Sequence, residues 1–157
     1  MSYYSVTRNT ELSTLKFIED NINNDWSSVN VIKSWSQRDK VANPVICVSL
    51  EDTTYDRKEL GNTQFRDTYI FNIEVFATSE AMRIDLSHYV INTLNPGWAY
   101  YTIEKGSGTS RELTYTSAGR CRIDKIYSNV RVDLGAKGDV KDKYRQDITI
   151  AVTVGVA

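Results

Sequence analysis

The end of the chain places the strongest constraint on the fold. From residue 147 to residue 156, apolar side chains alternate without a break with polar or small ones: Ile148, Ile150, Val152, Val154 and Val156 against Asp147, Thr149, Ala151, Thr153 and Gly155. Successive side chains of a β-strand point to opposite faces, so this pattern predicts a strand with one face on a core. The fold must therefore contain a sheet, together with elements that cover its apolar face.

Two segments with helical periodicity can provide that cover. The first spans about residues 11–26, after the capping residues Asn9 and Thr10, and its apolar stripe is formed by Leu12, Leu15, Ile18, Ile22 and Trp26. The second begins after Thr78 or Ser79 and ends at Asn95-Pro96-Gly97, with a stripe of Met82, Leu86, Tyr89, Val90 and Leu94. Spacings near about 3.6 residues place each set on one side of a helix.

The remaining segments predict strands and long connections. Strands are expected near residues 29–35, 45–50, 68–77, 98–104, 112–115 and 119–134, the last with a β-bulge near Asp124-Lys125, where its alternation shifts phase. Loops are expected near residues 51–67, 105–118 and 135–143, and the alternative for the first is that it holds the extended ends of the two strands that it joins. This order favours an α+β fold. We predict a single domain with an antiparallel or mixed β-sheet and its two main helices packed on one face.

The sequence contains no credible catalytic or metal site. His88 is the one histidine, and helical spacing places it outside the apolar stripe of the second helix. Cys47 lies in an apolar strand, and Cys121 is distant in sequence, so neither a CxxC motif nor a zinc-ligand spacing is present. We therefore expect a protein that is not an enzyme and that uses no cofactor and no metal.

Charge and hydropathy narrow the possible partners. The 19 basic and 20 acidic residues give a net charge of −1, which does not favour nucleic acid or an anionic membrane. No apolar run approaches the ~20 residues that span a bilayer, and the first residues do not resemble a secretion signal, so we expect a cytoplasmic product without a membrane partner. A modest basic cluster near Tyr127 leaves binding of single-stranded nucleic acid open as an alternative. Its members are Arg120, Arg122, Lys125 and Arg131.

Two surfaces are candidates for contact between subunits. Ile84 and Ile91 are seven residues apart and fall roughly opposite the apolar stripe of the second helix, so they are expected to be exposed. A loop of the same chain is an equally good cover for them. The polar side of the last strand carries the small residues Thr149, Ala151 and Thr153, which suit the close approach of another layer or subunit.

The charged loops are candidates for contact with other proteins. They contain Glu51, Asp52, Arg57, Lys58 and Glu59 in the first loop, and Lys137, Asp139, Lys141 and Lys143 in the last. Long connections in a compact domain are often functional. Charges of both signs alternate in the first loop, so a solvated surface is the alternative interpretation.

The chain resembles the tail terminator (tail completion) proteins of long-tailed bacteriophages. The resemblance is a pattern across most of the chain: an N-terminal helix, the segment from Pro44 to Glu51, a polar loop with Glu59-Leu60-Gly61, the segment from Tyr69 to Ala77, a helix from near Ser79, and the strand from Ile148 to Val156.

This resemblance implies a mechanical role in the virion. Such proteins form a homo-hexameric ring on the last ring of the tail tube, stop its polymerisation and offer a surface to the head–tail connector, and DNA passes through the ring without being read. The tail tube protein and the connector protein would then be the partners, and the protein would be assembled in the host cytoplasm and end in the neck of the tail. A connector adaptor or stopper ring protein is the nearest alternative.

Overall fold

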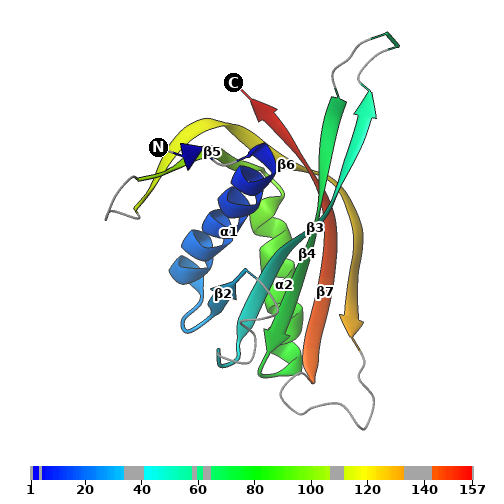
Figure 1. Cartoon of the computed structure of the whole chain (residues 1–157). Coiled ribbons are helices and arrows are strands. Elements are labelled where there is room, and N and C mark those ends of the chain that lie inside the picture. Colours follow the sequence, from blue (N-terminus) through cyan, green and yellow to red (C-terminus); the bar gives the residue numbers. More distant parts are fainter. Residues whose placement is uncertain are drawn as a thin grey trace.

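The computed structural model describes most of the chain, namely residues 2–3, 5–33, 41–57, 60–61, 65–106, 112–132 and 143–156. Its two helices are α1 (Val6–Asp25) and α2 (Glu80–Leu94). Its strands are β1 (Ser2–Tyr3), β2 (Asn30–Ile32), β3 (Val45–Arg57), β4 (Phe65–Ala77), β5 (Trp98–Lys105), β6 (Leu113–Val132) and β7 (Tyr144–Val156). Figure 1 shows how these elements are arranged.

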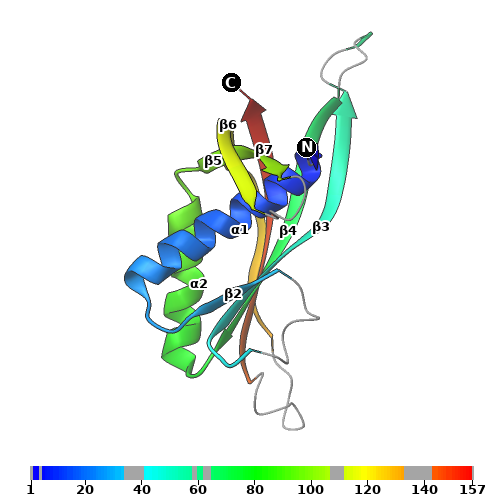
Figure 2. The ribbon, with the colours of Figure 1, turned by 60° about the vertical axis from the view of Figure 1, so that its left-hand side comes forward.

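The strands form one mixed sheet in the order β1-β5-β6-β7-β4-β3-β2. Only β2 and β3 run parallel, and every other neighbouring pair is antiparallel. Both helices lie on the same side of β3, β4 and β7 (Figures 1 and 2). The prediction of an α+β fold, with a mixed sheet and two helices on one face, is confirmed.

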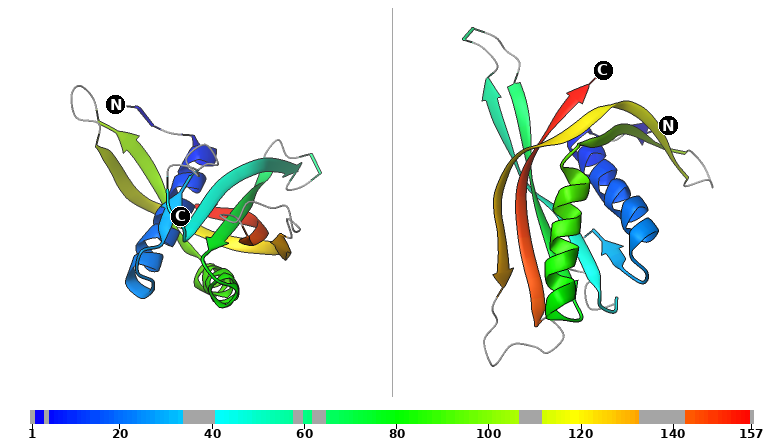
Figure 3. Two further views of the ribbon diagram at one scale, coloured as in Figure 1. Left: turned by 90° about the horizontal axis from the view of Figure 1, so that it is seen from below. Right: turned by 180° about the vertical axis from the view of Figure 1, so that it is seen from behind.

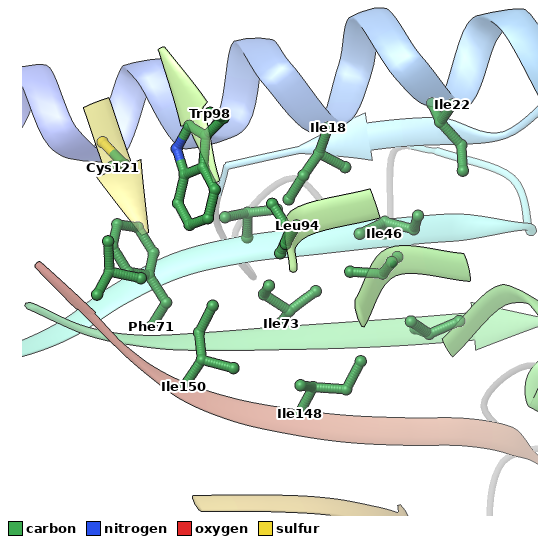
Figure 4. Packing of buried hydrophobic residues seen from close by; sticks show 14 of the residues in the cluster. Ile18, Ile22, Ile46, Phe71, Ile73, Leu94, Trp98, Cys121, Ile148 and Ile150 are labelled. Carbon is green, nitrogen blue, oxygen red and sulfur yellow. The ribbon is translucent and has the colours of Figure 1, made fainter. Parts of the chain in front are cut away.

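The two helices bury the apolar face of the sheet. Ile18 and Ile22 of α1 and Leu94 of α2 meet Ile73 of β4 and Ile148 of β7 in one continuous core (Figure 4). Side chains on the opposite face of β3 and β4, among them Cys47 and Phe76, form a smaller cluster with Ile32. Both faces of β3 near Cys47 are therefore buried, as its uncharged sequence predicts.

Local signals explain where the helices begin and end. The Ser79 hydroxyl accepts a hydrogen bond from the Met82 backbone N–H at 3.2 Å, which caps α2 at a predicted position. After α2, Gly97 adopts a φ of +87°, and a Cβ there would lie 2.8 Å from the Cys121 carbonyl oxygen. Only glycine fits this turn into β5 without displacing β6.

The start of α1 differs from the prediction. The helix begins at Val6 with Ser5 as its cap, so the expected caps Asn9 and Thr10 lie inside it, where both are buried. The Thr10 hydroxyl donates to the Val6 carbonyl oxygen at 2.8 Å, and the Asn9 amide donates to the Tyr100 hydroxyl at 3.4 Å. These two donors are tolerated inside the helix because each finds an acceptor.

The predicted loops are mostly strands. Residues 51–57 continue β3 and residues 65–67 begin β4, so the expected loop of residues 51–67 is largely a hairpin. Residues 113–118 belong to β6, which confirms the strand expected near residues 112–115 and corrects the loop expected around it. Residues 135–142 lie outside the described part of the chain, and β7 begins at Tyr144. The predicted bulge is confirmed, because the pairing of β6 with β7 shifts between Ile123 and Lys125.

The sheet divides into two branches at one end. β4 pairs with β7 from Ala77–Tyr144 up to Tyr69–Val152, and no farther. Beyond that pair, the described strands pair β4 with β3 alone and β7 with β6 alone. The β3–β4 hairpin therefore projects from the body as an arm that diverges from the C-terminal end of β7 (Figure 3, right).

Candidate functional site

The structure separates the two candidate isoleucines of α2. Ile84 is 44% exposed, as predicted. Ile91 is half-buried and packs against the main core, so the expectation that it is exposed is wrong. α2 contacts α1 as well as the sheet, so more than one stripe of this helix is buried. Ile84 alone remains available to another chain.

The small face of β7 is already covered within the chain. Ala151 and Thr153 are 1% and 6% exposed, and Thr149 is half-buried. Ala151 stands between its cross-strand neighbours Ile70 and Lys125. The Arg122 guanidinium donates to the Thr153 hydroxyl at 3.5 Å. The expectation that Ala151 and Thr153 need a second subunit as cover is therefore wrong, because long side chains of the flanking strands shield them.

The charged residues predicted to contact other proteins lie in several different places. Glu51 and Asp52 are exposed, but they lie on β3 beside a register shift in its pairing with β4, not in a loop. Arg57 ends β3. Lys143 is exposed, with its ammonium 5.5 Å from the centre of the Tyr144 ring. The other predicted contacts lie outside the described residues: Lys58, Glu59, Lys137, Asp139 and Lys141.

The basic cluster of β6 is divided in space. Arg131 approaches Glu80 of α2 at 3.9 Å. Lys125 lies over the Tyr127 ring at 4.9 Å. Arg120 and Arg122 lie toward the other end of β6, beside the last residues of β7. A continuous basic groove for nucleic acid is therefore not present on the described part of β6.

The structure places the histidine and the two cysteines on three different elements, α2, β3 and β6. His88 is exposed on α2. Cys47 and Cys121 are fully buried, and burial raises the pKa of the Cys121 thiol to about 12. A reactive cysteine needs the opposite shift, toward the thiolate. Among the described residues, no three His, Cys, Asp or Glu side chains are placed to hold a metal ion.

A cavity that the sequence did not reveal lies at the fork where the sheet divides. It has a volume of about 730 Å³ and is lined by Val6, Arg66, Asp67, Tyr69, Pro96, Arg120, Arg122, Thr153, Val154 and Gly155. Burial, assisted by the Asp67 carboxylate, raises the pKa of Tyr69 at this cavity to about 12. We call this cavity the fork. No local sequence signal predicts the fork, because its position depends on where β4 and β7, which are distant in sequence, stop pairing.

The sheet also has open edges that only its topology reveals. β5 pairs with β6 up to Cys121, so among the described residues the following part of β6, to Val132, pairs with β7 alone. On the other side, β2 pairs with Val45–Cys47 of β3, and the rest of β3 pairs, within the described part of the chain, with β4 alone. An unpaired strand edge is a template for another chain.

Comparisons with known proteins add no assignment. No model of a protein family matches this chain, and no curated protein sequence matches it. Neither described helix is long and apolar enough to cross a lipid bilayer. The function is therefore argued from the geometry and from the sequence pattern.

Proposed function

We propose that this protein is a tail terminator of a long-tailed phage, a non-enzymatic subunit that forms a ring on the tail tube and stops its polymerisation. The resemblance of the sequence suggests the role. One geometric observation carries it: the central part of the sheet, β6-β7-β4-β3, has an open edge on each side. A protein whose two edges complement each other can assemble into a ring of identical copies.

The strand directions support contact in a head-to-tail manner. All three pairs within β6-β7-β4-β3 are antiparallel, so β3 and β6 run in opposite directions. The open edge of β3 in one copy can therefore pair with the open edge of β6 in the next, and the antiparallel alternation continues through the contact. Such a contact uses two different surfaces, and a ring results when successive rotations close.

The side chains beside the β6 edge suit burial. Ile126, Tyr127 and Val130 are 41%, 53% and 52% exposed. Soluble monomers protect open edges with charges, bulges or short strands. Two register shifts interrupt β6, after which residues 128–132 pair regularly with β7. This regular stretch, with Val130 at its centre, is the part of β6 that we expect to pair with a neighbour.

The hairpin arm extends beyond the part of the β3 edge that we expect in the ring contact, and its far end supplies a further surface. It carries Tyr55, which is 61% exposed, and Leu60 near its tip, which is fully exposed. An apolar tip at the end of a projecting hairpin suits contact with another protein. In the proposed assembly the arm reaches the tail tube or the head–tail connector.

The test is a capping assay with variants of each edge. Val130→Lys and Thr54→Lys place a charge at an exposed position beside the β6 and β3 edges, respectively. Asn92→Lys, at an exposed position of α2, is the matched control. Tail tube subunits of the same virus polymerise in the presence of each protein, and tube length is measured by electron microscopy. We expect the native protein and the control to limit tube length, and both edge variants to fail.

Mixing the two edge variants tests the head-to-tail contact itself. Each variant keeps one intact edge, so a mixture forms a dimer through those two edges but no ring. A contact between two β6 edges predicts instead that Thr54→Lys still assembles. That result, or normal capping by Val130→Lys, contradicts the proposed contact. Capping that is absent even with the native protein contradicts the terminator role and favours a connector adaptor.

A further inference from the structure

The fork places two unpaired strand edges opposite each other. β4 from Arg66 to Thr68 is paired on its β3 side only, and β7 from Thr153 to Gly155 is paired on its β6 side only. No strand of the described part of the chain occupies the facing edges. The cavity of about 730 Å³ lies between them. Each edge offers alternating backbone donors and acceptors, the arrangement that an added strand recognises.

The polar lining of the fork is predominantly cationic. Three guanidinium groups line it, from Arg66, Arg120 and Arg122, against the single carboxylate of Asp67. Arg66 has an exposed ion pair with Asp124 at 3.3 Å. The other two arginines form no ion pair among the described residues.

Within the described part of the chain, the contacts of those two arginines do not neutralise their charge. Arg120 donates to the Pro96 carbonyl oxygen at 3.4 Å, and Arg122 donates to the Thr153 hydroxyl at 3.5 Å. Both distances exceed those of strong charge-assisted hydrogen bonds, and neither acceptor is charged. The guanidinium groups therefore remain able to bind an anionic ligand.

The strand register places the charges on one face. Arg120 and Arg122 are cross-strand partners of Gly155 and Thr153. Ile70 of β4 is the partner of Ala151 on β7, and Ala151 lies on the same face as Thr153 and Gly155. Arg66 lies four residues before Ile70 on β4, so it falls on this face too. Tyr69 and Val154 fall on the other face. The fork is thus basic on one face, and its other face carries Tyr69, Val154 and the carboxylate of Asp67, which lies two residues before Tyr69 on β4.

We infer that the fork binds an extended acidic segment of a partner protein, which adds as a strand between β4 and β7. Alternate residues of such a segment reach the two faces, carboxylates toward the arginines and apolar side chains toward Tyr69 and Val154. A nucleic acid strand fits less well, because its phosphates accept hydrogen bonds but offer no backbone donors to the strand edges. This inference does not depend on the proposed ring, which uses the outer edges of the sheet.

The probe is a fluorescein-labelled peptide of alternating valine and glutamate, about eight residues long, as strands commonly are. Its binding to the full chain is followed by fluorescence anisotropy, beside a valine–glutamine peptide and a single-stranded oligonucleotide of equal length. We expect saturable binding that is about tenfold tighter for the glutamate peptide, since charge-assisted hydrogen bonds are the stronger ones. The oligonucleotide is expected to compete poorly.

Two variants with the same change in charge separate the fork from general electrostatics. R120Q/R122Q removes two charges at the fork and is expected to weaken binding about tenfold or more. R131Q/K143Q removes two charges away from the fork, near the end of β6 and just before β7, and is expected to leave binding unchanged. All four side chains are exposed, so the substitutions are not expected to disturb folding.

Amide hydrogen exchange on the unmutated protein gives an independent readout. The added strand is expected to slow exchange at residues 66–68 and 153–155. Unchanged exchange there contradicts strand addition. Equal binding of the glutamate and glutamine peptides, or equal loss in both double variants, contradicts the role of the arginines. An oligonucleotide that binds as tightly as the peptide overturns the choice of a protein partner.

Discussion

Replacing Thr14 with valine tests how α1 is joined to the sheet. Thr14 is fully buried, and its hydroxyl accepts a hydrogen bond from the Trp98 indole N–H at 3.2 Å while it donates to the Thr10 carbonyl oxygen at 2.8 Å. Valine keeps the shape but removes the acceptor, which leaves the indole N–H buried and unpaired. An unpaired buried donor costs about 1–3 kcal/mol. We expect the free energy of unfolding to fall by about this amount in T14V.

The matched control is Thr10→Val on the same helix. Thr10 is equally buried, and its hydroxyl donates to the Val6 carbonyl oxygen at 2.8 Å. That carbonyl lies in the same helix, so T10V leaves no donor of the sheet unpaired. Urea unfolding followed by circular dichroism measures both variants. Thermal unfolding should show a shift of about 2–4 °C for each kcal/mol. Equal destabilisation of T14V and T10V would refute the reasoning.

Three further predictions concern stability. Because the folded pKa of Tyr69 is about 12 against 10.0 for the free group, stability is expected to fall as the pH rises from 10.0 to 12, and Tyr69→Phe should reduce this alkaline loss in urea unfolding. Ser79→Ala removes the cap of the Met82 N–H and should cost about 1 kcal/mol by the same assay, whereas no change would exclude a stabilising cap. Ile84→Asp should lower the free energy of unfolding by less than about 0.5 kcal/mol, and Ile91→Asp should lower it by clearly more. Equal effects of the two substitutions would contradict the different burial of the two side chains.

The parts of the fold that the sequence predicted are those with local signals. The alternation from Ile148 to Val156 identified β7, although the strand begins earlier, at Tyr144. Ser79 and Gly97 mark the two ends of α2 because a cap and a left-handed turn require these residue types. The phase shift near Lys125 identified the bulge of β6. Each of these signals is contained within a few residues.

The hairpin arm was predicted mainly as a loop, with extended strand ends as the alternative, because its strands are polar on both faces. Alternation reports a strand only when one face meets a core, and much of the arm has none: residues 54–56 and 66 are exposed. These residues are held instead by pairing with each other, from Thr54–Thr68 to Arg57–Phe65. Such pairing is a long-range property that composition does not encode.

The candidate sites were predicted less well than the fold. Ile84 was identified correctly as exposed, but Ile91, Ala151 and Thr153 are covered by neighbours that only the tertiary structure brings to them. The fork was missed because Arg66 and Arg120 are far apart in the sequence and meet only where β4 parts from β7. Sequence patterns indicate the side of a strand or helix on which a residue lies, but the topology of the sheet determines which residues lie opposite it.

The length of the tail in particles assembled without this protein tests the proposed function most directly. Electron microscopy of such particles gives the distribution of tail lengths. A tail terminator predicts overlong and uneven tubes that fail to join heads. Tails of normal length that remain unjoined would contradict the terminator role in favour of a connector adaptor, and normal virions would contradict any role in the neck.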